Sequence, residues 1–507
     1  MNVYASNTWE QSHENYTDTH LAIQWEIINW ERVEKHVNRI QTRIAKAVKA
    51  NKWNLVKRLQ HLITNSYYAK LLAIRHVTTN KGRKTSGIDG VRWVKPEDKM
   101  HAVSQLSNKG YKALPLKRVY IEKYGKKEKR PLGIPTMRDR AMQALHLISL
   151  EPIAETTADR TSFGFRKYRS PQDAKAYSFT VLCRKTSARW VLEGDIKGCF
   201  DNISHEWILE NIPMNTRILR QFLKAGFIFN KKLHQTDQGT PQGGPISATL
   251  ANMTLDGMET AISKKFWTNS KGKMDFTYKH KSKINLIRFA DDFIISAADK
   301  QTATELKAVV SNFLSTRTLT LSEEKTTISN IEDGHDFLGW NFRKYNQKLI
   351  IQPSCKSVKR ITEKLSRIIR ENRSVSQQQL IRLLNPIIIG WANYHQSACS
   401  KRTFSVLDSR LWNMLWKWAK RRHPKKGKKW VKERYWTAHK TRQWIFKDEN
   451  VILTRFSDKP IVRHACPILD KNPFLDRDYF EARKNKQKKQ KKIAYLRTTA
   501  AHLWDGS

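Results

Sequence analysis

Apolar residues recur at intervals of three and four over residues 21–75, which is the spacing of one face of an α-helix. Lysines and arginines lie between these apolar positions. The pattern predicts N-terminal helices that bury one face and present a basic face. The apolar positions include Leu21, Trp25, Val37, Ile40, Ile44, Leu59 and Ile63, and the basic positions are Lys46, Lys49, Lys52, Lys57 and Arg58.

The middle of the chain carries short β-branched and apolar runs that predict strands. Residues 284–290 and 293–296 are two such runs with only Asp291 and Asp292 between them, so we expect a hairpin with both aspartates at its tip. A third acid, Asp195, ends another strand-like run. Clustered carboxylates repel one another and lose hydration when buried, so they commonly hold cations. Two Mg²⁺ ions about 3.5–4 Å apart support in-line phosphoryl transfer, and the alternative is a solvated Asp-Asp turn.

Another pair of strand-like runs, residues 119–123 and 129–135, flanks a Gly-Lys-Lys turn and predicts a second hairpin. It carries Lys123 and Arg130, which are suited to grip a triphosphate, the lysine as a point charge and the arginine through paired hydrogen bonds. An apolar helix is predicted over residues 141–150, ending near the proline that follows.

Three apolar stripes at helical spacing follow residue 346 and predict a bundle of three helices. Together with the strands upstream, they make this an α+β chain. The stripes are Val358, Ile361, Leu365, Ile368 and Ile369; Leu380, Leu383, Leu384, Ile387 and Ile388; and Phe404, Leu407, Leu411, Leu415 and Trp418.

The charge balance points to a polyanionic partner. The 507 residues include 94 Lys+Arg against 46 Asp+Glu, a net charge of +48 spread from end to end. The N-terminal basic face is then either solvated or in contact with RNA. The densest patch combines Lys425, Lys426, Lys428 and Lys429 with neighbouring aromatics, a composition suited to RNA phosphates and bases.

The remaining composition argues against several classes. Five cysteines lie far apart without a CxxC pair, which argues against a disulfide framework and a zinc site. No apolar run reaches the roughly 20 residues that span a bilayer, and the first residues lack a leader pattern. We therefore expect a protein of a reducing, cytoplasmic compartment with no membrane partner.

Further residues are candidates for contacts with nucleotide or template. Arg166 and Arg169 lie in a loop that enters a helix, and they either face template or are surface arginines. Phe200 follows Asp195 by five residues, where its ring would clash with a 2′-hydroxyl; packing in the core is the alternative, and the residues alone favour it. Gln242 lies in a loop dense in Gly and Pro, whose backbone can pass close beneath a base pair.

Two later segments complete the set. Lys325 is suited to protonate a leaving pyrophosphate, and residues 337–340 predict a hairpin beside a primer strand.

The order of these motifs resembles that of the group II intron reverse transcriptases, and the chloroplast-like branch fits best. Each fragment is a weak signal, but eight in order from about residue 20 to about residue 480 are specific. The series is GIDG, RPLGIPTMRDRAMQAL, SFGFRK with RSPQDA, LEGDIKGCFDNISHEWIL, GTPQGGPIS with LANMTLDG, RFADDFII, LSEEKT and FLGW.

The resemblance implies a right-hand polymerase of fingers, palm and thumb, with an RRM-like palm sheet and an all-α thumb/maturase domain. It implies RNA-directed DNA synthesis from dNTPs with two Mg²⁺ ions, for which Mn²⁺ can substitute. It also implies binding of the intron RNA and of target DNA, in splicing and retrohoming.

The resemblance also assigns individual residues. Trp391 and Tyr394 fall in a maturase motif that binds intron RNA, although such rings are more often core than base-stacking residues. The other assignments are metal to Asp195, the Ile196 carbonyl, Asp291 and Asp292; triphosphate to Lys123 and Arg130; sugar to Phe200; the nucleotide pocket to Gln242 and Gly243; and the leaving group to Lys325.

We expect four regions along the chain. These are an N-terminal helical extension at 1–80, fingers and palm at 81–345, a thumb/maturase domain at 346–440, and a basic DNA-binding-like segment at 441–507. The last region includes a low-complexity basic tail over residues 483–492, which we expect to be flexible.

The sequence departs from the family pattern in three places. Phe289 replaces the usual Tyr but keeps the ring, and Glu122 replaces a Pro beside Lys123, where a carboxylate would weaken nucleotide binding. Many relatives end in an HNH endonuclease with paired CxxC motifs. Here Cys466 stands alone, so we expect no intrinsic cleavage of the second DNA strand.

Two other functions compete with this interpretation. One is a splicing-only maturase with a vestigial polymerase centre, and the other is a reverse transcriptase recruited to defence or repair. The intact acids argue against the first, because a decayed site has no reason to keep costly clustered charges. The maturase motif argues against the second.

Overall fold

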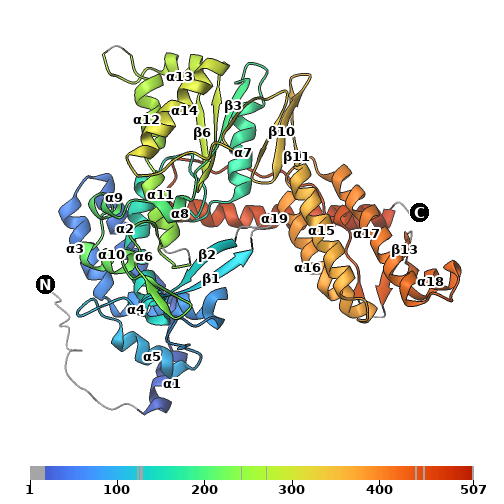
Figure 1. Cartoon of the computed structure of the whole chain (residues 1–507), viewed down its shortest axis with the longest axis horizontal. Helices are drawn as coiled ribbons and strands as arrows, with labels where there is room; N and C mark the ends of the chain where they lie inside the picture. Colours follow the sequence, from blue (N-terminus) through green and yellow to red (C-terminus); the bar gives the residue numbers. More distant parts are fainter. Residues whose placement is uncertain are drawn as a thin grey trace. The chain divides into compact units, whose positions relative to one another are not determined.

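The computed structural model describes residues 17–122, 125, 129–240, 243–269, 271–439, 442–448 and 451–504. The chain divides into two compact units, each discontinuous in sequence (Figure 1). The boundaries predicted at residues 80, 345 and 440 are based on sequence motifs, whereas the two units are defined by which residues pack together. The first unit holds the described part of Met1–Ala158, Gly198–Asp256 and Arg317–Leu319, and the second that of Asp159–Lys197, Gly257–Thr316 and Thr320–Ser507.

The first unit is built around the apolar helix α6 (Met137–Thr157), against which α2 (Trp30–Lys49), α3 (Trp53–Asn65) and α4 (Tyr67–Thr79) pack. The predicted helices are confirmed, and most of their apolar positions are buried, Ile44 completely. Ile23, Ile27 and Leu62, which share the predicted apolar spacing, are instead exposed. The other helices of the unit are α1 (Asp18–Glu26), η1 (Lys81–Lys84), α5 (Pro96–Gln105), α8 (Cys199–Asn202), α9 (His205–Asn211), α10 (Thr216–Leu223) and α11 (Ser247–Leu255).

Helix α6 continues past the point where we expected it to end. Pro152 lies inside the helix and cannot donate a hydrogen bond to the carbonyl of Ile148. The side-chain amide of Gln41 donates to that carbonyl instead, at 2.8 Å. A partner from α2 thus satisfies the group that proline leaves open, and the prediction of a helix end near residue 151 is wrong.

A four-stranded sheet in the order β2-β1-β4-β5 completes the first unit. Its strands β1 (Leu116–Glu122) and β2 (Lys129–Ile134) are antiparallel with Ile121 opposite Arg130, which confirms the predicted hairpin. The outer strands are β4 (Phe227–Phe229) and β5 (Lys232–His234).

The second unit contains an antiparallel sheet in the order β6-β7-β3-β8. Helix α14 (Lys300–Ser315) packs against β3 and β7, and α7 (Pro171–Leu182) against β6. The strands are β3 (Trp190–Asp195), β6 (Asn285–Phe289), β7 (Asp292–Ala297) and β8 (Thr327–Asn330), and two further helices are α12 (Met258–Phe266) and α13 (Phe276–Ser282).

The same unit contains the predicted bundle of three helices, α15 (Cys355–Glu371), α16 (Gln377–His395) and α17 (Lys401–Arg422). Members of all three predicted stripes form one buried core, which confirms the bundle; Leu383 is an exception and lies exposed. A small antiparallel sheet precedes it, formed by β9 (His335–Phe337), β10 (Trp340–Tyr345) and β11 (Lys348–Pro353).

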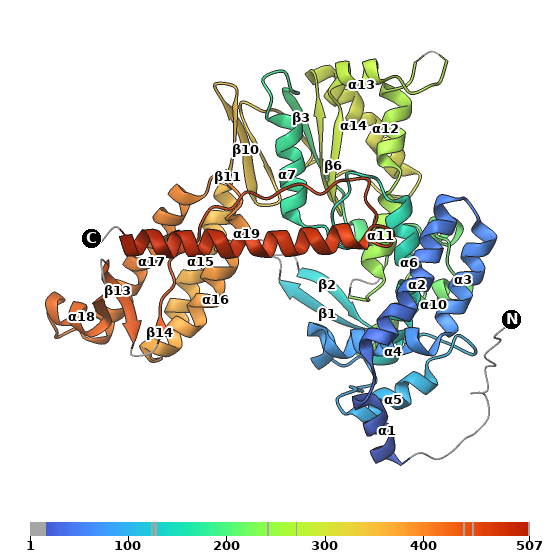
Figure 2. The same ribbon diagram turned by 180° about the vertical axis from the view of Figure 1, so that it is seen from behind.

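The C-terminal region is ordered where we expected a flexible tail. Helix α19 (Arg477–Trp504) includes residues 483–492 and runs unbroken in Figure 2. Lys, Arg, Gln and Ala are good helix formers, and buried Phe480 anchors the start of the helix. The other elements are α18 (Lys428–Tyr435), β12 (Trp436–His439), β13 (Arg442–Asp448), β14 (Val451–Ile452) and η2 (Phe456–Asp458).

The α+β class predicted from the sequence is confirmed. Among the helices of the described residues, none combines the length and the apolar character that crossing a bilayer requires.

Candidate active site

Two antiparallel strands bring Asp195 and Asp292 together. They are the last residue of β3 and the first residue of β7, and they lie opposite each other in the register. The turn between β6 and β7 consists of Ala290 and Asp291, and Phe289 and Asp292 pair on either side of it. The predicted hairpin is therefore confirmed, and the three acids lie at one edge of the sheet.

A glycine loop supports the acidic turn. The backbone N–H of Phe163 donates to the carbonyl of Arg288 at 2.8 Å, which holds the following residue, Gly164, against the turn. A Cβ at Gly164 would lie 2.3 Å from the backbone nitrogen of Ala290. Ala290 itself has a φ of 59°, a left-handed conformation that is uncommon for alanine. The turn thus depends on a side-chain-free neighbour.

The acids repel one another strongly. Burial, followed by the charges of Asp291 and Asp195, raises the pKa of Asp292, although part of this residue stays open to solvent. The close approach of the Asp195 carboxyl group adds to this rise in the pKa of Asp292. The ammonium of Lys325 donates to Oδ2 of Asp195. Although burial lowers the pKa of Lys325, this hydrogen bond and the three negative charges raise it overall.

The residues fit divalent cations. Among the described residues, no three acid, histidine or cysteine side chains form a ready-made metal cage. The three acids nevertheless lie at one edge of the sheet, where the ammonium of Lys325 pairs with Asp195. Hard cations prefer such carboxylate oxygens, and they would supply positive charge that offsets the repulsion among the three acids.

The backbone carbonyl of Ile196 is not used in pairing with the segment around Leu321. Ile196 lies opposite Leu321 in an isolated antiparallel bridge. The flanking hydrogen bonds run from Lys197 N to Thr320 O and from Ser322 N to Asp195 O. In this pattern the carbonyl of Ile196 points away from Leu321. Its role as a metal ligand stays a prediction.

Sequence reasoning did not single out Glu193. It precedes Asp195 by two residues, so both side chains point to the same face of β3. Burial, together with repulsion from Asp336, raises the pKa of Glu193 to about 7. The alternation of side chains along the predicted strand could have placed Glu193 on the same face as Asp195.

Of the residues predicted to bind the nucleotide, Arg130, Phe200 and Gly243 lie in the first unit, and Lys123 and Gln242 fall outside the described residues. Arg130 is exposed on β2. Gly243 has a φ of 129°, and a Cβ there would lie 2.5 Å from the carbonyl oxygen of Gly133. This glycine therefore lets its loop pack directly on β2.

Phe200 is half-buried in α8 rather than fully enclosed in the core. Its carbonyl accepts a hydrogen bond from the backbone N–H of Thr240 at 2.7 Å, which ties α8 to the Gly-Pro loop. The sugar contact of Phe200 stays a prediction.

The two loop arginines are engaged by the protein. Arg166 donates to the carbonyls of Asp159 and Ser162 at 2.9 and 3.0 Å. Arg169 donates to the carbonyl of Leu469 at 3.2 Å. These bonds give both arginines a structural role, and contact with template stays a prediction.

The aromatic pair of the maturase motif is also engaged internally. Tyr394 stacks on Trp340 at 4.6 Å between ring centroids, and its hydroxyl donates to the carbonyl of Leu338. Trp391 packs against the helical core and donates from its indole to Ser357. This packing favours a role for both rings in the core, which is the alternative to RNA binding.

The predicted basic patch lies where α17 gives way to α18, and all four of its lysines are exposed. Trp430 beside them is 37% exposed, with the ammonium of Lys426 5.5 Å from its ring centroid. The lysines are Lys425, Lys426, Lys428 and Lys429.

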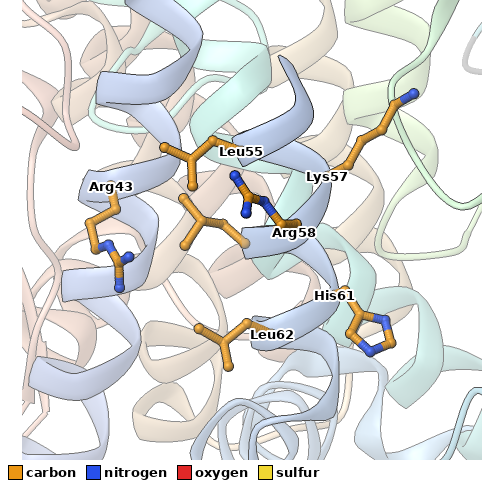
Figure 3. Close-up of a pocket in the computed structure, with 7 residues that line it drawn as sticks. Arg43, Leu55, Lys57, Arg58, His61 and Leu62 are labelled. Carbon is orange, nitrogen blue, oxygen red and sulfur yellow. The ribbon is translucent and has the colours of Figure 1, made fainter. Parts of the chain in front are cut away.

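Two positions of the predicted N-terminal basic face, Lys57 and Arg58, line an open pocket of about 650 Å³ between α2 and α3 (Figure 3). Leucines form its floor, and the basic side chains of Arg43 and Arg58 border it, with Lys57 and His61 on the outer side of α3. The arrangement combines apolar and cationic surface at one place.

Three family models match successive parts of the chain. The N-terminal domain of reverse transcriptase matches residues 25–106, the reverse transcriptase (RNA-dependent DNA polymerase) model matches residues 121–342, and the group II intron maturase-specific domain matches residues 358–436. Both sheet strands that carry the three acids lie inside the second match.

Two curated relatives are each similar to more than half of the chain. The group II intron-encoded protein LtrA of Lactococcus lactis subsp. cremoris is 32% identical over 328 residues, which cover 54% of each chain. Protein YkfC of Escherichia coli K12 is 31% identical over 318 residues, covering 56% of this chain and 82% of YkfC. This chain thus spans about half the length of LtrA.

Among solved structures, a telomerase from Candida albicans in complex with a fragment of telomeric RNA shows a TM-score of 0.35 and 12% identity, over 63% of this chain and 64% of the telomerase. This similarity is too low to define the fold.

Proposed function

The chain belongs to the family of group II intron-encoded reverse transcriptases, and we propose that it is an RNA-directed DNA polymerase that also binds the intron RNA as a maturase. The observation that carries the polymerase proposal is the register of the central sheet. It sets Asp195 opposite Asp292, with Asp291 in the adjoining turn. The proposed partners are the intron RNA, target DNA and dNTPs.

The chain's residues divide the work of nucleotide addition. Asp195, Asp291, Asp292 and the Ile196 carbonyl would hold two Mg²⁺ ions or Mn²⁺ in their place. When bound, such ions stabilise the attacking and the leaving oxygens of an in-line displacement. Lys325 carries the proton that the departing pyrophosphate takes up. The triphosphate is assigned to Lys123 and Arg130, the sugar to Phe200, and the base pair to Gln242 and Gly243.

Alanine at Asp291 or Asp195 tests the polymerase proposal. We expect primer extension on an RNA template with dNTPs and Mg²⁺ to fall below detection, because losing a metal ligand removes several kcal/mol of transition-state stabilisation. RNA binding should persist. The control is Asp333→Ala, an exposed turn aspartate of the same unit. Wild-type extension by either mutant would overturn the proposal.

The maturase part of the proposal is supported by the match over residues 358–436 and by the exposed basic patch at the end of α17. A splicing assay on the intron RNA tests it separately. The Asp291→Ala protein should still promote splicing, since that activity needs binding rather than polymerisation. If the wild-type protein splices but never extends a primer, the splicing-only alternative is correct.

A further inference from the structure

Four tryptophans form one cluster on the C-terminal side of the helical bundle. Trp412 and Trp416 lie one turn apart on α17, with their rings 5.5 Å apart and nearly parallel at 9°. Trp436 opens β12 and Trp444 lies in β13. The centroids of all six ring pairs lie between 5.3 and 6.4 Å. We name these residues the tryptophan cluster.

The backbone presents Trp444 in an unusual way. The pairing of β12 with β13 shifts register between Thr437 and His439, which marks a β-bulge. Trp444 falls within it and has a φ of 65°. A bulky residue in this left-handed region is strained, and such strain is commonly retained where a side chain has a function. Bulges also re-aim side chains beside functional sites.

Trp444 is the outer member of the cluster. Its side chain is 39% exposed, whereas Trp436 beneath it is buried. The edge-to-face contacts with Trp412 and Trp416, at 71° and 62°, hold the indole from the side. A rigid, partly exposed ring supported by other rings can accept a flat partner with little loss of conformational entropy.

One cation lies against the Trp444 ring, and two further lysines lie on the helices that carry its neighbours. The ammonium of Lys432 lies 4.6 Å from the Trp444 centroid. Lys428 is one helical turn before Lys432 on α18, and Lys420 is one turn after Trp416 on α17; both are exposed. Glu433 is an exposed acid on α18, and Asp408, one turn before Trp412, is occupied by the backbone N–H groups of η2.

We propose that Trp444 is a stacking platform for an unpaired nucleobase, with Lys432 and the neighbouring lysines binding the adjacent phosphates. A π-face flanked by cations suits a single-stranded nucleic acid, because bases stack on aromatic rings while lysines neutralise the backbone. The inference rests on the proposed nucleic-acid-binding function and extends it to a defined site. Nothing in it depends on the three acids.

The test measures binding of a short single-stranded RNA, and of a DNA of the same sequence, to the full chain in the Asp291→Ala background. Trp444→Gly removes the ring and tolerates the left-handed backbone, so the hairpin is kept. We expect affinity to fall roughly 5- to 150-fold with the slope of log affinity against log salt unchanged. Trp444→Phe should restore most of the affinity.

Matched arms separate stacking from charge. Lys432→Gln should flatten the salt slope by roughly 0.7, whereas an abasic strand should bind wild type and Trp444→Gly equally. Tyr345→Ala is the control, since Tyr345 is also an exposed ring beside a cation, Arg343, in the same unit. A loss with RNA alone, or with DNA alone, identifies the natural strand.

Several outcomes would overturn the stacking proposal. One is that Trp444→Gly binds both strands with wild-type affinity. Others are that Trp444→Gly loses as much affinity for the abasic strand as for the intact one, or that Trp444→Phe binds no better than Trp444→Gly. The last is that Trp444→Gly changes the oligomeric state of the protein and leaves its affinity for the strands unchanged. Primer extension by an otherwise wild-type chain is scored separately. If the protein extends primers but the Trp444 variants bind normally, only the stacking proposal is rejected. If binding depends on Trp444 but the protein does not extend primers, only the polymerase proposal is rejected.

Discussion

Two glycines allow neighbouring segments to pack closely around the acidic turn and its strands. Gly164 lies against the backbone of Ala290, and Gly194 lies against the ring of Phe293 on the neighbouring strand, where a Cβ would come within 2.1 Å of ring carbon. Both glycines belong to motifs seen in the sequence. Glycine is needed at these two positions for close packing around the carboxylates rather than for forming a turn.

Gly164→Ala should therefore impair polymerisation more than stability. Its Cβ would lie 2.3 Å from backbone that cannot rotate away, so the turn bearing Asp291 must shift. Misplacement of about 1 Å can cost roughly 100-fold in rate, and we expect a loss of that order in steady-state primer extension. Gly390→Ala is the control, because a Cβ there meets nothing within 4 Å. Equal activity of both variants would contradict the supporting role of Gly164.

Phe200→Ala tests the sugar-contact interpretation. If the half-buried ring excludes the 2′-hydroxyl, the ratio of rNTP to dNTP incorporation should rise roughly tenfold or more, as expected when a pocket loses a steric contact. Single-nucleotide extension with each substrate measures the ratio. Phe229→Ala, a partly buried ring of the same unit, is the control. An unchanged ratio would return Phe200 to a packing role.

At the scale of elements, a buried carboxylate connects three segments of the second unit. Asp173 on α7 is 1% exposed and accepts hydrogen bonds from His464 at 2.7 Å and from Arg483 on α19. Burial alone would raise the pKa of Asp173, but the hydrogen bond from His464 and the charge of Arg483 lower it. This contact explains why the basic C-terminal segment begins as an anchored helix.

Asp173→Asn should reduce the free energy of unfolding by about 3–5 kcal/mol, since it leaves a buried arginine without its charge partner. The folded-state pKa of Asp173 is depressed, so its contribution is complete above the ordinary aspartate pKa and is lost as pH falls through the lower folded value. The difference between wild type and variant should thus be constant near neutral pH and shrink below about pH 4.

Denaturant unfolding across pH measures this difference. Asp470→Asn is the control, because Asp470 pairs with Arg160 where both side chains are more than half exposed, and surface pairs contribute about 0–1 kcal/mol. A difference that persists unchanged at the lowest pH would refute the ionic origin of the effect.

At the scale of the molecule, the net charge of +48 is the dominant property. With roughly six to ten phosphate contacts, RNA affinity should fall by about 10³–10⁵ between about 50 and 200 mM salt. Replacing Lys425, Lys426, Lys428 and Lys429 by glutamine should flatten that dependence. The control replaces four exposed lysines of the same unit, Lys264, Lys265, Lys271 and Lys273. Equal slopes for the two quadruple variants would place the contacts elsewhere.

The sequence by itself determined which segments form strands and helices around the acids. Hydrophobic periodicity is local, so it predicted the hairpin of Asp291 and Asp292, the strand that ends on Asp195, and the three C-terminal helices. Motif order predicted the family. These features need only the neighbours of each residue in the chain.

Only the tertiary structure decided what depends on partners far apart in sequence. Gln41 lets α6 pass Pro152 by taking up the carbonyl that proline leaves open, and Asp173 anchors a helix where composition suggested a flexible tail. Trp444 joins three other tryptophans through a bulge that no periodicity shows. Such effects come from hydrogen bonds, charges and ring contacts between distant segments, which a local pattern does not encode.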